Sequence, residues 1–238
     1  MTTTESWHSE RLGTTISVSR WGEIGRPVLV FPTAGGDAGE IERFGLISAL
    51  APLLADGRIK VYSVDSVAGR SWLNGDDPGH SAWLQNQFDQ SVRWEVVPAI
   101  HADSGPIPII GAGASIGAFN AVASLCRHPD VFGAAIGMSG TYDLEPWLKG
   151  HWSDDFYFSS PLHYLPGLDG EQLEQLRQRF VLLATGTGGH ENPGESWRLA
   201  DVLGAQGIPT RVDTWPGWTH DWPTWRAMLP TYLHELTT

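Results

Sequence analysis

Ile109-Ile110-Gly111-Ala112-Gly113-Ala114-Ser115-Ile116-Gly117-Ala118-Phe119-Asn120 is the stretch on which the interpretation of the whole chain depends. It begins as a short apolar strand and, after a sharp turn, continues into a helix of small residues over 118–125. The turn contains Gly113-x-Ser115-x-Gly117, the pattern of a nucleophile elbow. Glycines flank the serine because a side chain at either place would collide with the neighbouring strand and helix. We therefore expect the Ser115 hydroxyl to stand above the sheet.

The residue after this serine has a role of its own. The backbone N–H of Ile116 lies at the start of the predicted helix, where it can stabilise an oxyanion. The five residues 113–117 alone are also compatible with a Gly/Ser turn in any α/β protein. The predicted strand before them and the predicted helix after them favour the elbow, because the motif requires that context.

Composition bounds the class of protein. The chain has 238 residues, of which 41% are hydrophobic and 18% charged, which is typical of a globular protein. This length predicts one large α/β domain over 1–238 with a sizeable core. The net charge of −12 argues against nucleic acid and anionic membrane surfaces as partners and favours a neutral small-molecule substrate.

The single cysteine, Cys126, permits no intramolecular disulfide, so nothing points to an oxidising compartment. Residues 1–11 are polar and lack the apolar core of a signal peptide, and no apolar run is long enough to span a membrane. We therefore expect a cytoplasmic protein. Its oligomeric state is not indicated by the sequence.

Outward from the elbow, strand patterns alternate with helix patterns. An initial hairpin is expected from strands 14–21 and 27–31. The remaining elements are strands at 59–64, 106–110, 133–138, 180–184 and 209–214, and helices at 40–55, 81–101, 195–205 and after Asp221. Such alternation predicts an open, mostly parallel sheet with an antiparallel edge and helices on both faces, which binds ligands at the carboxyl ends of its strands.

Two segments near the predicted site carry further expectations. Small residues follow the strand 27–31, and the backbone N–H of Ala34 or Gly35 is a candidate second oxyanion donor; an ordinary strand-to-helix loop is the alternative. Residues 141–179 form a short irregular insertion instead of a full cap domain. Its aromatic residues are candidates for lining an acyl pocket or, alternatively, for forming a small satellite core: Trp147, Trp152, Phe156 and Tyr157.

A serine hydroxyl becomes a good nucleophile only when a base takes its proton and a third group orients that base. Enzymes with this elbow carry serine, acid and histidine in that order along the chain. His220 follows the last predicted strand and is the candidate base. Glu191 is the one carboxylate in the loop after the penultimate strand and is the candidate acid, with Asp213, inside the last strand, as its competitor. No set of His, Cys and Asp residues has metal-ligand spacing, so neither a metal nor an organic cofactor is implied.

With these residues in place, the chain resembles the esterase branch of the α/β hydrolases that includes esterase D, feruloyl esterases and the mycolyltransferases. The resemblance covers nearly the whole chain. Its more specific parts are short segments: Val64-Asp65-Ser66 with Ser71-Trp72, Trp94-Glu95-Val96-Val97-Pro98, Tyr157-Phe158-Ser159-Ser160-Pro161, Glu191-Asn192-Pro193 and His220-Asp221-Trp222-Pro223-Thr224-Trp225. Many relatives have an aspartate where this chain has Glu191.

The resemblance implies the α/β-hydrolase fold and a serine carboxylic-ester hydrolase that works through an acyl-enzyme. It implies Ser115 as nucleophile, His220 as base and Glu191 as acid, with the oxyanion hole formed by the backbone of Ile116 and of Ala34 or Gly35. An acyltransferase or amidase with the same triad is one alternative. A non-catalytic binding protein that keeps the fold is another.

Overall fold

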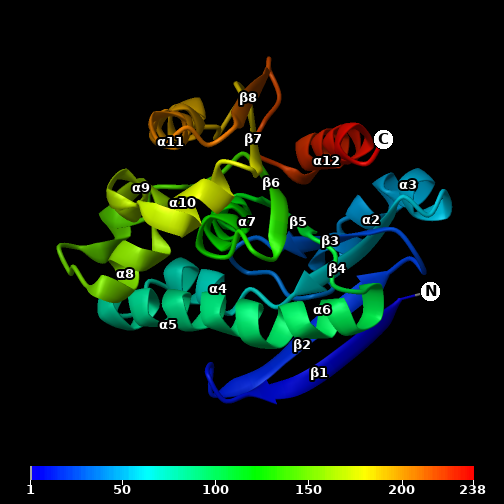
Figure 1. The fold of residues 1–238 in the computed structure, drawn as a ribbon, viewed down its shortest axis with the longest axis horizontal. Coiled ribbons are helices and arrows are strands. Elements are labelled where there is room, and N and C mark those ends of the chain that lie inside the picture. The colour runs from blue at the N-terminus through cyan, green and yellow to red at the C-terminus, as the bar shows by residue number, and fades with distance from the viewer. Residues whose placement is uncertain (1) are drawn as a thin grey trace.

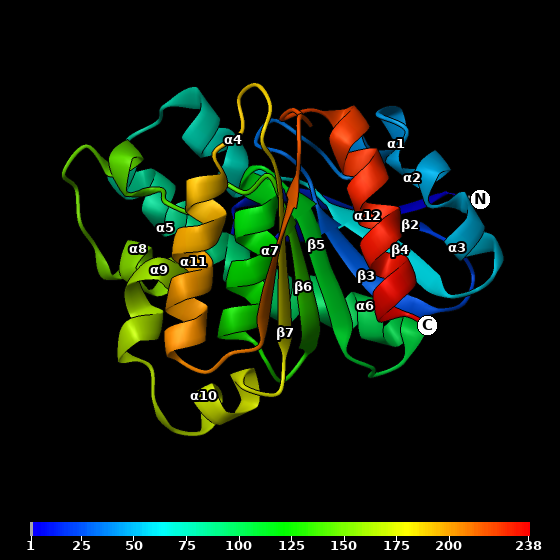
Figure 2. The same cartoon turned by 90° about the horizontal axis from the view of Figure 1, so that it is seen from above.

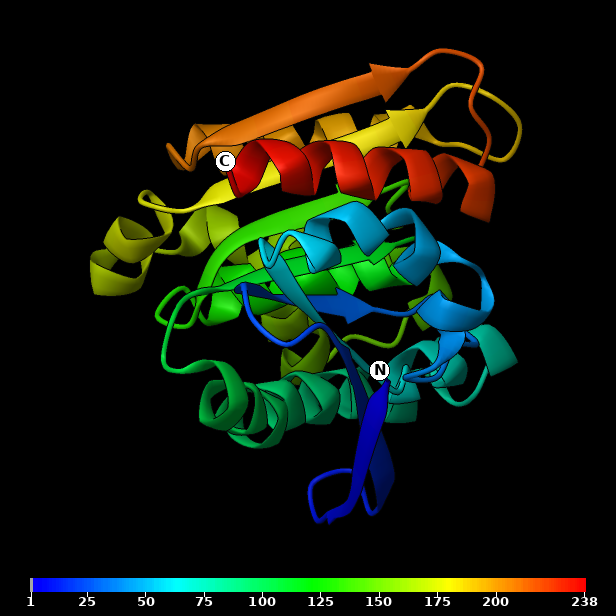
Figure 3. The ribbon, with the colours of Figure 1, turned by 90° about the vertical axis from the view of Figure 1, so that its right-hand side faces the viewer.

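A computed structural model describes residues 2–238 and contains one eight-stranded sheet in the order β1-β2-β4-β3-β5-β6-β7-β8. From β4 to β8 along this order, neighbouring strands are parallel, and β1 and β2 form an antiparallel edge (Figure 3). The mostly parallel sheet expected from the sequence is confirmed. The strands are β1 (Thr3–Ser9), β2 (Thr14–Trp21), β3 (Arg26–Phe31), β4 (Ile59–Val64), β5 (Ile109–Ala114), β6 (Phe132–Met138), β7 (Phe180–Gly186) and β8 (Thr210–Trp215).

The initial hairpin differs from the expected one. β2 pairs with β1 on one side and with β4 on the other, whereas β3 lies between β4 and β5. The expected pairing of 14–21 with 27–31 is therefore wrong. The sequence did not predict β1, because most of its side chains are exposed and it lacks the apolar alternation of a half-buried strand.

Helices cover both faces of the sheet (Figures 1 and 2). One face carries α1 (Glu40–Arg43), α2 (Leu46–Ala49), α3 (Ala51–Ala55) and α12 (Trp222–Leu236). The other carries α4 (Val67–Asn74), α5 (Pro78–Ser91), a π-helical turn η1 (Val92–Val96), α6 (Val97–Ser104), α7 (Ile116–Arg127) and α11 (Pro193–Ala205). Within residues 2–238, no helix combines the length and apolarity that crossing a membrane would need.

The helix expected over 40–55 is divided into α1, α2 and α3. Gly45, with φ 77°, ends the first turn in a left-handed conformation, and Pro52 lies at the start of the third piece. Proline is tolerated at a helix start but not in a helix interior. The breaks change which side chains face inward: Leu46, Leu50 and Leu53 pack in the core on this face of the sheet, whereas Phe44 is 46% exposed.

Residues 141–179, expected to be irregular, are largely helical: η2 (Glu145–Leu148), α8 (Asp154–Ser159), α9 (Pro161–Tyr164), η3 (Leu165–Gly167) and α10 (Gly170–Leu176). α8 packs against α5, and Asn86 of α5 donates a hydrogen bond to Asp155 of α8 at 2.6 Å. These elements are too short to show helical periodicity in the sequence, which is why the segment resembled a loop.

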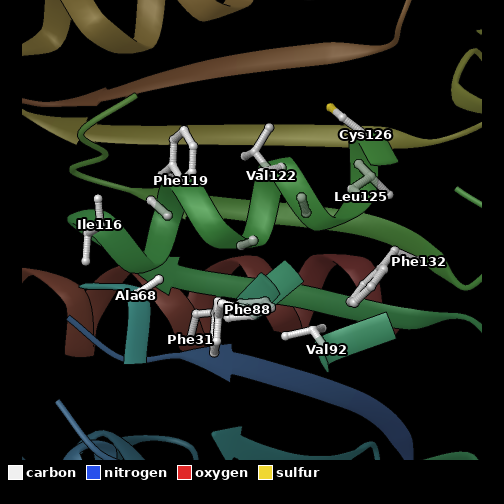
Figure 4. Close-up of a cluster of buried hydrophobic side chains, with 14 of the residues drawn as sticks. Phe31, Ala68, Phe88, Val92, Ile116, Phe119, Val122, Leu125, Cys126 and Phe132 are labelled. Atoms are coloured by element: carbon white, nitrogen blue, oxygen red, sulfur yellow. The ribbon is translucent and has the colours of Figure 1, made fainter. Parts of the chain in front are cut away.

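Two apolar cores lie on opposite faces of the sheet. The larger one surrounds α7, whose residues 116–126 are all buried; Figure 4 shows Phe119, Val122 and Cys126 of this helix with Phe31 and Phe132 from the neighbouring strands. Burial raises the pKa of the Cys126 thiol to about 12. The core therefore holds the helix that follows the elbow rigidly against the sheet.

The strand order also predicts where a ligand would bind. From β3 the chain moves outward to β4 and then returns to the other side of β3 as β5. In open α/β sheets, ligands bind beyond the carboxyl ends of the strands at such a reversal. The two loops at this point contain Ala34 and Gly35 after β3, and Ser115 after β5.

Candidate active site

Ser115 lies in a tight turn between β5 and α7, with φ 57° and ψ −124°. Few non-glycine residues adopt a positive φ, and those that do cluster at functional sites. Hydrogen bonds hold the turn on three sides. The Ser115 N–H donates to Met138 O at 3.0 Å, and its carbonyl accepts from the N–H groups of Ala118 at 3.1 Å and Thr141 at 3.2 Å. Together they make the strained backbone the stable arrangement.

The flanking glycines are required by close backbone approach. A Cβ on Gly117 would lie 2.6 Å from the carbonyl oxygen of Pro32 and would overlap that of Phe31. A Cβ on Gly113 would overlap the backbone of Gly117. The first turn of α7 therefore lies directly against the loop that follows β3, as the elbow pattern predicts.

That loop contains Ala34 and Gly35, the two candidates for the second oxyanion donor. Glu40 holds its start: the Thr33 N–H and hydroxyl donate to the buried Glu40 carboxylate at 2.8 and 2.7 Å. Its end is held by the Gly36 carbonyl, which accepts from the N–H of Ser66 at 3.2 Å. The backbone of Ala34 and Gly35 is thus fixed beside the N-terminus of α7, where the Ile116 N–H lacks an intrahelical acceptor.

His220 is half-buried in the loop between β8 and α12. Its N–H donates to Gly189 O at 3.2 Å, which ties this loop to the one after β7. Its ring packs edge-on against Trp225, with the ring centroids 5.2 Å apart. Burial lowers the pKa of His220 below its ordinary value, an effect that the charge of Glu191 opposes. The imidazole is therefore neutral at pH 7, as a general base must be.

Glu191 lies in the loop after β7, and both of its carboxylate oxygens have hydroxyl groups nearby. Ser139 Oγ donates to Oε1 at 2.6 Å, and Thr185 Oγ1 lies 3.1 Å from Oε2. Ser139 Oγ also accepts from the indole N–H of Trp225 at 3.0 Å. The carboxylate is thereby connected to the residue that packs on His220.

Asp213 is placed differently. It lies inside β8, opposite Ala184 of β7, before the strand reaches its carboxyl end. Its Oδ2 is 3.1 Å from Arg211 Nη2. Burial raises the pKa of Tyr232 to about 12, and the charge of Asp213 adds to this effect. Burial lowers the pKa of His220, and the charges of Glu191 and Asp221 oppose that effect.

The aromatic residues proposed for substrate binding fall into two groups. Phe156 is 1% exposed and packs in the larger core, and Tyr157 is half-buried against the same core. Trp147 and Trp152 are 40% and 52% exposed. Trp147 helps to line a cavity of about 170 Å³ between η2 and α4, in which its ring centroid lies 6.0 Å from that of Trp72.

Ser139, Thr185 and Trp225 were not singled out from the sequence, although they surround the candidate acid. A signal existed for two of them: Ser139 follows β6 at the level of the elbow, and Trp225 belongs to the segment 220–225. Among residues 2–238, no group of three or more His, Cys, Asp or Glu side chains is arranged to hold a metal ion.

Comparison with known proteins identifies the fold. The sequence matches no protein-family model and no curated protein. Its fold is similar to that of a ferulic acid esterase (TM-score 0.77, 16% identity, covering 100% of this chain and 98% of that one). The chain has the α/β-hydrolase fold.

Two further structures agree with this α/β-hydrolase assignment. They are an S-formylglutathione hydrolase from Agrobacterium tumefaciens (TM-score 0.75, 12% identity, 99% of this chain and 94% of that one) and Mycobacterium tuberculosis MPT51 (FbpC1) (TM-score 0.72, 18% identity, 98% of both). The α/β-hydrolase fold expected from the sequence is confirmed.

Proposed function

We propose that the protein is a serine carboxylic-ester hydrolase in which Ser115 attacks the ester carbonyl. The observation that carries this proposal is the backbone of Ser115, with φ 57° at the junction of β5 and α7 in an α/β-hydrolase fold. Structures of similar fold include a ferulic acid esterase and S-formylglutathione hydrolases, which supports ester cleavage as the reaction.

In the proposed mechanism, His220 takes the proton of Ser115 as the hydroxyl attacks, and Glu191 stabilises the imidazolium that forms. The negative charge on the former carbonyl oxygen is stabilised by the N–H groups of Ile116 and of Ala34 or Gly35. His220 then protonates the alcohol oxygen as the ester C–O bond breaks. The alcohol departs, and the acyl group remains bound to Ser115 as an acyl-enzyme. A water molecule activated by the same histidine releases the acid and restores Ser115.

Labelling with a fluorophosphonate tests the proposal directly, because such reagents phosphonylate an activated serine. We expect the folded protein to be labelled at Ser115, as located by mass spectrometry, and the Ser115→Ala variant not to be labelled. Heat-denatured protein is the control, since the reaction needs the assembled site. An unlabelled folded protein would support the alternative of a non-catalytic binding protein.

Product analysis with an ester substrate then separates hydrolysis from transfer. With added alcohol, a hydrolase releases mainly the free acid, whereas an acyltransferase forms mainly the new ester. We expect the free acid to dominate. A panel of p-nitrophenyl esters of increasing acyl length would define the acyl group that the site accepts.

A further inference from the structure

Ser139 is a second serine held in an unusual conformation at the same end of the sheet. It follows β6 directly, is 3% exposed and has φ 48°. Its N–H donates to Ala184 O of β7 at 2.7 Å, so its backbone is fixed between two strands. A positive φ at a non-glycine residue is costly, and the surrounding structure must maintain it. Here it directs the hydroxyl toward Glu191.

The hydrogen bonds around Ser139 have a defined direction. The indole N–H of Trp225 can only donate, and it does so to Ser139 Oγ at 3.0 Å. The one hydroxyl proton of Ser139 therefore remains for Glu191 Oε1, 2.6 Å away, a distance typical of a bond to a charged oxygen. The result is a chain from Trp225 through Ser139 to Glu191 in which each group has a single orientation.

Thr185, the other hydroxyl beside the carboxylate, is a weaker restraint. Its Oγ1 lies 3.1 Å from Glu191 Oε2 and also 3.1 Å from Gly186 O, so two acceptors compete for one proton. The shorter and undivided bond is the one from Ser139. The position of Glu191 thus depends mainly on Ser139.

We propose that Ser139 and Trp225 are positioning residues that hold the carboxylate of Glu191 in register with His220. The inference rests on the proposed function, since it assigns a role within that triad. Trp225 contacts both Ser139 and His220: its indole N–H donates to the Ser139 hydroxyl, and its ring packs against the imidazole of His220. One side chain of α12 therefore contacts both the candidate base and the serine that binds the candidate acid.

A glutamate needs this support more than an aspartate would. Its side chain has an additional rotatable bond, so more conformational freedom must be removed to hold its carboxylate in one place. In this chain, the loop carrying Glu191 is also one in which His190 has φ 63° and lies exposed. The buried hydroxyl groups therefore add a restraint on the carboxylate itself, beyond the backbone hydrogen bonds that hold the loop, such as the one from Gly188 N–H to Trp218 O at 2.8 Å.

The test uses Ser139→Ala, Trp225→Phe and the double variant in the full chain. We measure kcat and KM with p-nitrophenyl acetate, the fluorophosphonate labelling rate and the melting temperature. Phenylalanine keeps an aromatic ring beside His220 but removes the N–H. Ser196→Ala, which truncates a buried serine without a partner among the described residues, and Trp7→Phe, which removes an indole N–H bond to Glu95, are the matched controls.

Ser139→Ala should lower kcat and the labelling rate about 10- to 100-fold, the loss expected for a hydrogen bond to a charged group. Trp225→Phe, which removes a bond between two neutral groups, should lower both about 2- to 10-fold. In both variants KM should stay within about twofold of wild type. The double variant should react no more slowly than Ser139→Ala, because both changes break the same chain. The controls should leave kcat unchanged.

Several outcomes would overturn the inference. If wild type is labelled at Ser115 and folded Ser139→Ala is labelled at the same rate, the positioning role is wrong while the proposed function stands. Multiplicative losses in the double variant would mean that the two residues act independently. If Ser139→Ala does not fold, Trp225→Phe alone decides, and an unchanged kcat refutes the role. Absence of wild-type labelling removes both proposals.

Discussion

Ser115 and Ser139 occupy matched positions at the ends of adjacent parallel strands. Ala114 of β5 is paired with Met138 of β6, and the residue that follows each of them is a serine with positive φ, 57° and 48° respectively. The Ser115 N–H donates to Met138 O, the carbonyl of the peptide bond that joins Met138 to Ser139. A hydrogen bond therefore links the two turns directly. In the proposed mechanism, one serine attacks the substrate and its neighbour orients the acid.

Glu191 and Asp213 give opposite expectations when each is neutralised. Glu191→Gln should reduce kcat about 10³- to 10⁴-fold, by analogy with triad acids in other serine hydrolases, because the imidazolium loses its partner. Asp213→Asn should change kcat far less, since its contacts are with Arg211 and Tyr232. Steady-state kinetics on both folded variants check this. If kcat falls strongly in Asp213→Asn and stays near the wild-type value in Glu191→Gln, the triad acid is Asp213 on the last strand.

The pH dependence follows from the lowered pKa of His220. The base must be neutral to accept a proton, and burial shifts its pKa below the ordinary value of 6.5. The acid limb of kcat/KM, which reports the free enzyme, should therefore have its midpoint below pH 6.5 and a slope of one.

The Glu191→Gln variant should show the acid limb of its residual activity at still lower pH. The reason is that the variant lacks the Glu191 charge, which raises the pKa of His220. His190 and Asp221 also act on this imidazole, lowering and raising its pKa respectively, and they are unchanged in the variant. A midpoint above 6.5, or a profile flat down to pH 4, would argue against His220 as the base.

Alanine substitutions at Gly117 and Gly204 should have opposite effects on the free energy of unfolding. Gly117→Ala places a methyl group against the carbonyl oxygens of Phe31 and Pro32, and we expect a loss of about 1–3 kcal/mol or more in the free energy of unfolding. Gly204 is exposed in α11 with open space around it, so Gly204→Ala should stabilise by about 0.4–1 kcal/mol. Denaturant unfolding measures both. Equal effects would contradict the close packing at the elbow.

Phe156 and Trp147 separate a packing role from a substrate role. Phe156→Ala should destabilise the protein by about 3–5 kcal/mol, the usual cost of truncating a buried phenylalanine, and should lower activity toward all esters alike. Trp147→Ala should leave the melting temperature nearly unchanged, because the side chain is 40% exposed, yet alter the preferred acyl length. If Trp147→Ala has the same relative activity across the ester panel, that residue does not contact the substrate.

Much of the fold could be predicted because the decisive signals are local. The buried strands β3 and β5 are apolar runs, and the elbow lies between one of these runs and a helix of small residues, all within twelve consecutive positions. The cap of the last helix was also predictable, since Asp221 accepts from the Trp222 N–H at 2.7 Å and Pro223 lies in the first turn.

The remaining features depend on contacts between distant residues. The exposed strand β1 is defined by pairing with β2 and not by its own pattern. The role of Ser139 depends on Glu191, 52 positions further along the chain, and on Trp225, 86 positions away. Neither separation leaves a periodic trace in the sequence, so spacing alone could not bring these side chains together.

The buried thiol of Cys126 has a practical consequence. It lies on α7, the helix that begins immediately after Ser115, and it is wholly enclosed and protonated at neutral pH. A thiol reagent can react with it only when this helix detaches from the sheet. The modification rate of Cys126 therefore reports how often α7, the helix that begins after Ser115, detaches from the sheet. The measurement needs no engineered cysteine, because Cys126 is the one cysteine of the chain.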